Sequence, residues 1–359
     1  MPKQTPTSTN GMTIEGLFRI AVEQKASDLH IVVGKPPILR IDGHLAEIEN
    51  AETLTHEHAQ ELVYALLSDA QRAKLEKDRE LDMSYEIPDL SRFRVNVHWE
   101  KGNIGLVARV VSNNIPTMEE ILMPEIAYKL ARLHDGLILV TGPTGCGKST
   151  TLASMINLIN KERNAHIITL EDPIEFIFKP DKSVIKQREL GSDILSFASG
   201  LKHSLRQDPD VLMVGEMRDL ETIAATMTLA ETGHLVLATL HTINAAQTVD
   251  RIIDVFPPYQ QDQIRVQLSM TLRSVISQKL LNKQTGGGRV PAREVMLNNP
   301  AIANLIRENK VAQIKSVIQT SANEGMMTMD QDIKRIYQQN IISKETAISN
   351  MIDPRSLNV

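Results

Sequence analysis

The chain has 359 residues, a mass of 40.0 kDa and a formal net charge of −5 at pH 7. At roughly 100–200 residues per domain, this length allows about two or three domains. Hydrophobic residues make up 42% and charged residues 23%, which is ordinary for a globular protein and excludes a disordered chain or a fibre. No apolar run approaches the ~18 residues that cross a bilayer, which excludes an integral membrane protein.

The single cysteine, Cys146, excludes an internal disulfide framework and any zinc site built from several cysteines. The first ten residues are polar and lack the apolar segment of a secretory signal, so we expect a cytoplasmic protein. The sequence pI of about 6.1 argues against a general nucleic-acid binder.

The first third of the chain combines helical and strand patterns and ends in a polar stretch. Helices are expected over 14–22, 55–67 and 70–77, and strands over 31–33, 38–41, 45–48, 81–87, 91–100 and 104–111. Turns such as Asp42-Gly43 and Pro88-Asp89 join these strands, which indicates a mainly antiparallel sheet. The polar, proline-containing stretch 112–116 breaks the pattern and predicts a boundary between domains.

After this boundary, strand, loop and helix patterns alternate. Apolar strands are expected over 136–140, 166–170, 211–214 and 235–240, and helices over 149–160, 194–206, 220–231 and 245–254. Such alternation is typical of a parallel α/β sheet covered by helices on both faces. Beyond residue 257 we expect mostly helix, interrupted by a turn at Gly286, Gly287 and Gly288.

The segment 142–149 reads GPTGCGKS and fits the phosphate-binding pattern G-x-x-x-x-G-K-[ST]. It lies between a predicted strand and a predicted helix, which is the context that this motif requires. The glycines let backbone N–H groups turn towards phosphates, Lys148 is expected to reach the β- and γ-phosphates, and Ser149 to bind Mg²⁺. The alternative is a glycine-rich turn that binds nothing. Cys146 fits better as a tolerated small residue than as a nucleophile.

Carboxylates follow two of the predicted parallel strands. Glu171, Asp172 and Glu175 follow the second strand, and Glu216 follows the third. Because the carboxyl ends of parallel strands line the ligand crevice, we expect all four near the phosphates, where carboxylates orient water or hold a metal. Glu171 and Asp172, with Ser149, are the predicted Mg²⁺ ligands, partly through water. Alternatively, Asp172 and Glu175 cap a helix or turn.

Two histidines bracket the strand 235–240. His241 lies at its carboxyl end, close to the expected γ-phosphate, where an imidazole can sense that phosphate or bind a carboxylate. His234 lies at the opposite end, where position alone favours a structural role. The strand before Glu216 departs from the standard Walker B pattern, because it ends in Gly215-Glu216 rather than in aspartate.

Together these motifs resemble the secretion-superfamily ATPases of type II secretion and type IV pili. Segments 142–150, 168–176, 208–219 and 232–242 resemble their Walker A, Asp-box, Walker B and His-box motifs, in that order. Within the family, the chain is most similar to the pilus-retraction (twitching-motility) ATPases. It carries AIANLIRE over 301–308, with Ala303 where their element has arginine, and its one cysteine cannot supply a four-cysteine zinc insertion. The resemblance assigns nucleotide binding to Gly142, Pro143, Thr144, Gly145, Cys146, Gly147, Lys148, Ser149 and Thr150.

The resemblance implies an N-terminal PAS-like α+β domain over 1–112, a linker over 113–121 and a RecA-like P-loop ATPase domain with a helical C-terminal region over 122–359. It also implies a ring-shaped homohexamer that binds ATP and Mg²⁺ between these domains. It places the catalytic glutamate at Glu175 and the acidic Walker B residue at Glu216. Both His234 and His241 match the His box and are candidate catalytic residues.

Two arginines are expected on strands of the first domain, Arg94 and Arg109. Arg109 shares its predicted strand face with the apolar Val107 and Val111. A charged guanidinium on such a face is unusual, which indicates a specific role for Arg109. In the resembling family, arginines that match Arg94 and Arg109 reach the nucleotide's phosphates and stabilise charge in the transition state. The alternative for each is a structural or snorkelling arginine.

The leading hypothesis is therefore a hexameric, Mg-ATP-hydrolysing motor that drives pilin disassembly and so retracts type IV pili. Such a motor works in the cytoplasm, peripheral at the inner-membrane face, and docks on an inner-membrane pilus platform protein. A paralogous retraction ATPase is a further candidate partner, and no nucleic acid is expected. The alternatives are an accessory retraction motor, a secretion or DNA-uptake motor of the same superfamily, and a nucleotide-gated scaffold without turnover.

Overall fold

The computed structural model describes residues 13–41, 43–88, 90–112 and 114–358. The predictions for the first ten residues, and those that rest on Asp42, Asp89 and Asn113, lie outside these ranges. Within the described ranges, every helix is too short or too polar to span a bilayer.

The chain folds into two compact units. The first contains Met1–Asn114 together with Glu175–Ile177, and the second contains Ile115–Ile174 and Phe178–Val359. The polar stretch expected to act as a linker is partly packed on the second unit. Met118 is only 2% exposed, and the carbonyl of Pro116 accepts a hydrogen bond of 2.7 Å from Ser154 Oγ.

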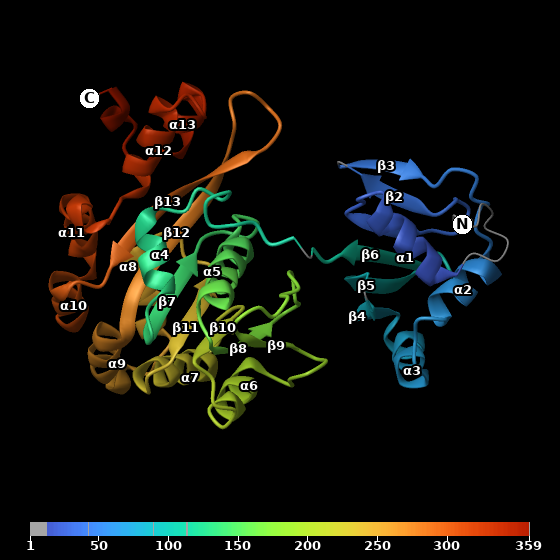
Figure 1. Ribbon diagram of the computed structural model, residues 1–359, viewed down its shortest axis with the longest axis horizontal. Coiled ribbons are helices and arrows are strands. Elements are labelled where there is room, and N and C mark those ends of the chain that lie inside the picture. The colour runs from blue at the N-terminus through green and yellow to red at the C-terminus, as the bar shows by residue number, and fades with distance from the viewer. Residues whose placement is uncertain (1–12, 42, 89, 113, 359) are drawn as a thin grey trace. The chain divides into compact units, whose positions relative to one another are not determined.

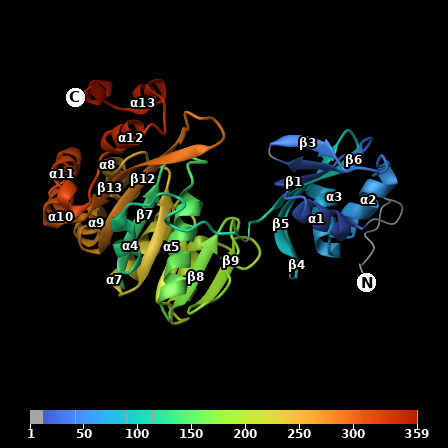
Figure 2. The ribbon, with the colours of Figure 1, turned by 45° about the horizontal axis from the view of Figure 1, so that its top comes forward.

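In its described residues, the first unit forms a six-stranded sheet with three helices (Figures 1 and 2). The strands are ordered β3-β2-β1-β6-β5-β4, and all neighbouring pairs are antiparallel, as the short turns predicted. Its elements are α1 (Ile14–Glu23), β1 (Asp28–Ile31), β2 (Ile38–Ile41), β3 (His44–Glu47), α2 (His56–Tyr64), α3 (Asp69–Asp78), β4 (Glu80–Ile87), β5 (Ser91–Glu100) and β6 (Asn103–Val110).

The core of the first unit forms between α1 and the sheet. Thr13 caps α1 through its hydroxyl, and the apolar stripe of this helix, including Leu17 and Phe18, is fully buried. Phe18 stacks on Phe93 of β5, with ring centroids 4.3 Å apart. The strand expected over 31–33 lies earlier, as β1, because Asp28 pairs with β2 on one side and β6 on the other.

The second unit is built on a seven-stranded sheet of order β13-β12-β7-β11-β10-β8-β9, parallel except for β13. This confirms the predicted α/β class. Its elements are α4 (Glu125–Ala131), β7 (Gly136–Thr141), α5 (Lys148–Glu162), β8 (His166–Glu171), β9 (Val184–Glu189), α6 (Phe197–Ser204), β10 (Val211–Val214), α7 (Leu220–Glu231), β11 (Leu235–Leu240), α8 (Ala245–Asp254), α9 (Pro258–Thr271), β12 (Leu272–Asn282), β13 (Arg289–Leu297), α10 (Pro300–Arg307), α11 (Ile314–Thr320), α12 (Met329–Gln338) and α13 (Lys344–Asn350).

Helices cover both faces of this sheet (Figure 1). Alternate strand residues, such as Leu137 and Leu139 of β7, pack in one large cluster with residues of α6, α7, α8 and α9. The helix α5 contacts β7 and β11 without contributing to that cluster, so it covers the opposite face. The central strands β7, β10 and β11 are therefore buried on both sides, which explains their continuous apolar sequences.

The prediction of mostly helix beyond residue 257 is wrong over 272–297. There the chain forms the long hairpin of β12 and β13, and β12 joins the sheet beside β7. The helical C-terminal region begins only at Pro300, with α10. A third strand, β9, was not predicted because its residues are mostly polar, as an edge strand permits.

Candidate nucleotide-binding site

The phosphate loop connects the buried strand β7 to the long helix α5. Gly142, Gly145 and Gly147 have φ values of +141°, +75° and +89°, a region that favours glycine. Gly147 occupies the N-cap of α5 without a side-chain hydrogen bond to the first turn. The N–H groups of that turn and the positive end of the helix dipole are therefore left for an anion, as phosphate binding requires.

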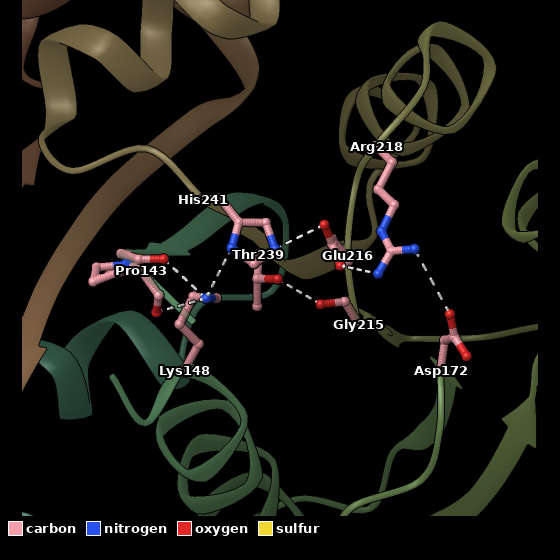
Figure 3. Close-up of polar contacts among 9 residues, drawn as sticks. Pro143, Lys148, Asp172, Gly215, Glu216, Arg218, Thr239 and His241 are labelled. Carbon is pink, nitrogen blue, oxygen red and sulfur yellow. Dashed lines mark hydrogen bonds and ion pairs between the residues drawn. The ribbon is translucent and has the colours of Figure 1, made fainter. Parts of the chain in front are cut away.

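Lys148 is the first residue of α5, and its side chain folds back over the loop (Figure 3). Its Nζ donates to the carbonyl oxygens of Gly142 at 2.9 Å and Pro143 at 3.2 Å. The ammonium group is thus held at the mouth of the loop by neutral acceptors. A phosphate is a stronger, charged acceptor for the same group, so this geometry suits phosphate capture.

A row of polar side chains continues from Lys148 across the carboxyl ends of three strands (Figure 3). Lys148 Nζ lies 3.5 Å from Nδ1 of His241, and Nε2 of His241 lies 2.8 Å from Oε1 of Glu216. The other carboxylate oxygen of Glu216 lies 2.8 Å from Nη2 of Arg218, whose Nη1 is 4.0 Å from Asp172. The structure therefore brings Lys148, His241, Glu216 and Asp172 together, as the strand-end argument predicted.

Charge keeps Glu216 ionised. Burial alone would raise the pKa of this carboxyl group, but the hydrogen bond from Arg218 and the charges of His241 and Arg218 outweigh it and hold the pKa below its ordinary value. Glu216 is thus a fixed negative charge at neutral pH. Because it is anchored at both oxygens, its position depends on Arg218 and His241.

The other carboxylates of this region occupy different environments. Glu171 is 7% exposed, and its Oε1 accepts hydrogen bonds from Thr169 Oγ1 at 2.6 Å and Gln187 Nε2 at 3.1 Å. Its carboxylate is therefore engaged within the fold, and its predicted contact with a metal stays a prediction. Asp172 is exposed and faces Arg218.

Magnesium fits the donors that this site offers. Among the described residues, no group of three or more His, Cys, Asp or Glu side chains is placed to hold a metal ion. Mg²⁺ at nucleotide sites is held largely by phosphates and water, with one or two protein ligands. Ser149, in the first turn of α5, offers a hydroxyl oxygen. Asp172 offers a carboxylate, and Arg218 contacts both Asp172 and Glu216, so the site has the one or two protein ligands that Mg²⁺ needs.

Two predicted catalytic residues lie outside the row. Glu175 belongs to the first unit, because the adjacent Phe176 pairs with Ser112 in a short β-bridge. Within the described ranges, its exposed carboxylate has no hydrogen-bond or ion-pair partner. His234 precedes β11, and its Nδ1 lies 3.0 Å from the carbonyl oxygen of Leu229, at the end of the strand opposite to His241.

The two predicted phosphate-binding arginines are neighbours in the first unit. Arg94 of β5 lies directly opposite Arg109 of β6, and both are exposed. Arg109 Nε donates to Oδ1 of Asp28 at 2.8 Å, and Ser27 Oγ donates to Oδ2 of the same carboxylate at 2.8 Å. Asp28 therefore explains the guanidinium on a strand face with Val107, while most of the Arg109 side chain stays accessible.

Comparisons with known proteins identify the family. The model of the type II/IV secretion system proteins matches residues 11–351. The chain belongs to this family. It is 47% identical to the type IV pilus retraction ATPase PilT of Pseudomonas aeruginosa over 336 residues, which cover 94% of this chain and 97% of that protein. It is 46% identical to the twitching motility protein of Neisseria gonorrhoeae, over 93% of this chain and 89% of that protein.

A solved structure supports the same assignment. The crystal structure of the pilus retraction motor PilT with bound ADP matches with a TM-score of 0.89 and 46% identity, over 97% of this chain and 99% of that one. The predicted family and the RecA-like ATPase fold are confirmed. The chain is a nucleotide-binding ATPase of the type II/IV secretion family, and its phosphate loop is the expected nucleotide site.

Three residues of this family member were missed as functional candidates from sequence. Arg218 stands between Glu216 and Asp172, Asp28 holds Arg109, and Gln278 of β12 contacts the phosphate loop. Arg218 lies inside the segment 208–219 that carried the family resemblance, so that segment held a signal. Gln278 lies in a region predicted to be helical, so its place beside the loop could not be deduced.

We predict that Asp28→Asn lowers the free energy of unfolding of the first unit by about 1 kcal/mol at pH 7. Hydrogen bonds from Ser27 and Arg109 outweigh burial and hold the pKa of Asp28 below its ordinary 3.8. For a lowered pKa, the stabilisation is present above the unfolded value and is lost as the pH falls through the folded value. The difference should therefore shrink when the pH falls below about 4.

Urea unfolding followed by the fluorescence of Trp99, the one tryptophan of the chain, reports on the first unit. The matched control is Asp78→Asn at an exposed position of α3, which should leave the transition unchanged. A difference between Asp28→Asn and the parent protein that is as large at pH 3 as at pH 7 would show that the carboxylate charge is not responsible.

Proposed function

We propose that this ATPase powers the retraction of type IV pili, as a homohexameric motor that drives pilin disassembly. The observation that supports this most strongly is the row from Lys148 through His241 to Glu216 beside a complete phosphate loop. It occurs in a chain that is 47% identical to a PilT retraction ATPase along nearly all of both sequences. A scaffold without turnover would have no need of this chemistry.

In the proposed reaction, Lys148 and the N–H groups of the loop bind the β- and γ-phosphates. Glu175 orients the attacking water, since its carboxylate is exposed and unpaired among the described residues. His241 lies between Lys148 and Glu216 and can report the presence of the γ-phosphate to Glu216. A catalytic role for His234 stays a prediction.

Arg94 and Arg109 are proposed to stabilise the charge that develops on the phosphates. Arginine suits this role because it stays charged and binds phosphate oxygens through a planar fork. We propose that the PAS-like domain (1–112) supplies these arginines and that the RecA-like domain (122–359) supplies the loop, with 113–121 between them. Hydrolysis then drives relative domain motion. This arrangement requires both domains for turnover.

Mg²⁺ is the proposed metal cofactor, held by Ser149 and, through water, by Asp172. When bound, it neutralises charge on the β- and γ-phosphates. The hydroxyl of Ser149 is placed for this by the first turn of α5, and Asp172 is kept close to Glu216 by Arg218. Glu171 is a weaker candidate for a Mg²⁺ ligand, because its Oε1 already accepts hydrogen bonds from Thr169 and Gln187.

The proposed place of action is the cytoplasmic face of the inner membrane, where the ring docks on a platform protein of the pilus. A paralogous retraction ATPase is a proposed second partner. Deletion of the gene in its own host tests the function. We expect surface pili to become more numerous and twitching to stop, because pili still extend but no longer retract.

Complementation separates the motor from a scaffold. Wild-type protein should restore twitching, whereas Glu175→Gln, which keeps the shape of the residue, should not. A deletion strain without pili would make the protein an extension motor. Unchanged pili and motility would point to an accessory or redundant motor, and restoration by Glu175→Gln would favour the scaffold.

A further inference from the structure

The strand β12 extends beyond its parallel neighbour and lies along the phosphate loop. β7 ends at Thr141, which pairs with Ser277, whereas β12 continues to Asn282. The hydroxyl groups of Thr141 and Ser277 lie 2.8 Å apart and join the two strands at the point where the loop begins. The next residue of β12, Gln278, therefore stands beside the loop itself.

Gln278 connects two parts of the nucleotide site. Its Nε2 donates to the carbonyl oxygen of Cys146 in the loop at 2.8 Å, and its Oε1 accepts from Thr151 Oγ1 in the first turns of α5 at 3.0 Å. The carbonyl of Cys146 fixes the orientation of the amide, because it can only accept a hydrogen bond and a flipped amide would face it with an oxygen. Gln278 is only 2% exposed, so water cannot readily replace either partner.

The loop is shaped to receive this residue. A Cβ atom at Gly142 would lie 2.4 Å from the backbone oxygen of Gln278, and one at Gly147 would lie 3.4 Å from its Nε2. Both glycines also have positive φ values. The lack of a Cβ at Gly142 therefore permits the close approach of β12 as well as that of phosphates, whereas a Cβ at Gly147 would make only an ordinary van der Waals contact with Gln278.

We propose that Gln278 is a positioning residue, which holds the phosphate loop in the conformation that binds the nucleotide. Without its amide, the Cys146 carbonyl and the Thr151 hydroxyl would be buried and unpaired. The free loop would then rearrange to reach other partners, and each binding event would have to reverse that rearrangement. This inference rests on the proposed role of the loop in binding phosphates.

The test is ADP binding to Gln278→Met, which keeps the length and apolar bulk of the side chain but makes neither hydrogen bond. We expect ADP affinity to fall about tenfold to a hundredfold, the cost of one or two unpaired buried groups. Calorimetric titration of ADP and thermal unfolding of the nucleotide-free protein are measured on the same samples. Affinity within twofold of wild type in a cooperatively folded variant would overturn the proposal.

The matched control is Ser274→Ala. Ser274 lies earlier on the same strand, before the part of β12 that contacts the loop. It is fully buried, and its hydroxyl donates to the carbonyl oxygen of Met296 at 2.8 Å. Both variants can lower the melting temperature. A merely structural role for Gln278 predicts that both leave ADP affinity unchanged, whereas a positioning role predicts a loss for Gln278→Met alone.

If Gln278→Met does not fold, Thr151 decides the question. Thr151→Val removes the hydroxyl that donates to Gln278, and Thr151→Ser keeps it. We expect Thr151→Val to weaken ADP binding several-fold and Thr151→Ser to restore it; equal affinities for both would contradict the proposal. Lys148→Ala in the same titration tests whether the loop binds the phosphates. If Lys148→Ala binds ADP normally, the loop is not the phosphate site; if only Lys148→Ala weakens binding, the loop is that site and the role of Gln278 is wrong.

Discussion

Lys148→Ala is expected to abolish ATP hydrolysis and to weaken ADP binding on the order of a hundredfold. The Lys148 ammonium is held at the mouth of the loop by the carbonyl oxygens of Gly142 and Pro143, at 2.9 and 3.2 Å. Exchange of these neutral acceptors for phosphate oxygens creates an ion pair that no other side chain of the described loop 142–149 supplies. The measurements are phosphate release under saturating ATP and calorimetric titration with ADP.

Lys161→Ala is the matched control for charge. Lys161 lies exposed in the last turn of the same helix, so its removal changes the net charge equally but leaves the loop intact. Lys148→Arg adds a second comparison, because it keeps the charge but cannot fit the same compact position. Near-normal ADP binding by Lys148→Ala would refute the assignment of this loop as the phosphate site.

The bounds of strands are predicted best from the sequence where the strands are most deeply buried. β10 and β11 have the predicted bounds because central parallel strands are apolar throughout and end abruptly at polar loops. The row of Lys148, His241 and Glu216 was predictable for the same reason. Once the strands are placed in parallel, their carboxyl ends must meet at one edge, and the residues that follow them must lie there.

The failure that matters most for the site involves a strand whose parallel partner lies far away in sequence. β12 pairs with β7 across more than a hundred residues, and its apolar residues fit helical and strand spacing alike. Nothing local therefore distinguishes the hairpin of β12 and β13 from a helix. The position of Gln278 beside the loop depends wholly on that pairing, which explains why a buried polar residue of the site had no signal in the sequence.

Partners of charged side chains were equally hidden. Arg109 lies on a strand face with apolar residues because it binds Asp28, which is 81 residues away in sequence and adjacent in the sheet. An antiparallel register decides such a pair, and register cannot be read from the strands separately. Arg218 follows Glu216 by two residues, yet its link to Asp172 depends on the pairing of β10 with β8.

Replacement of either proposed catalytic glutamate by glutamine is expected to reduce ATP turnover on the order of a thousandfold while leaving ADP affinity within a few-fold of wild type. The two variants should differ in stability. Glu216 binds His241 and Arg218 through its two oxygens, each at 2.8 Å, so the amide of Glu216→Gln must present its NH₂ group to one of these donors. Glu175 has no such partners in the described chain.

The melting temperature of the nucleotide-free protein should therefore fall for Glu216→Gln and stay unchanged for Glu175→Gln. Single-turnover phosphate release, with ADP titration and thermal unfolding on the same preparations, measures all three quantities. Glu221→Gln, at an exposed position in the first turn of α7, is the control and should alter none of them. Wild-type turnover by Glu175→Gln would remove this residue as the group that orients water. Burial alone would raise the pKa of Glu216, but Arg218 and His241 hold it below its ordinary value, so we expect that protonation of Glu216 causes no loss of activity under mildly acidic conditions.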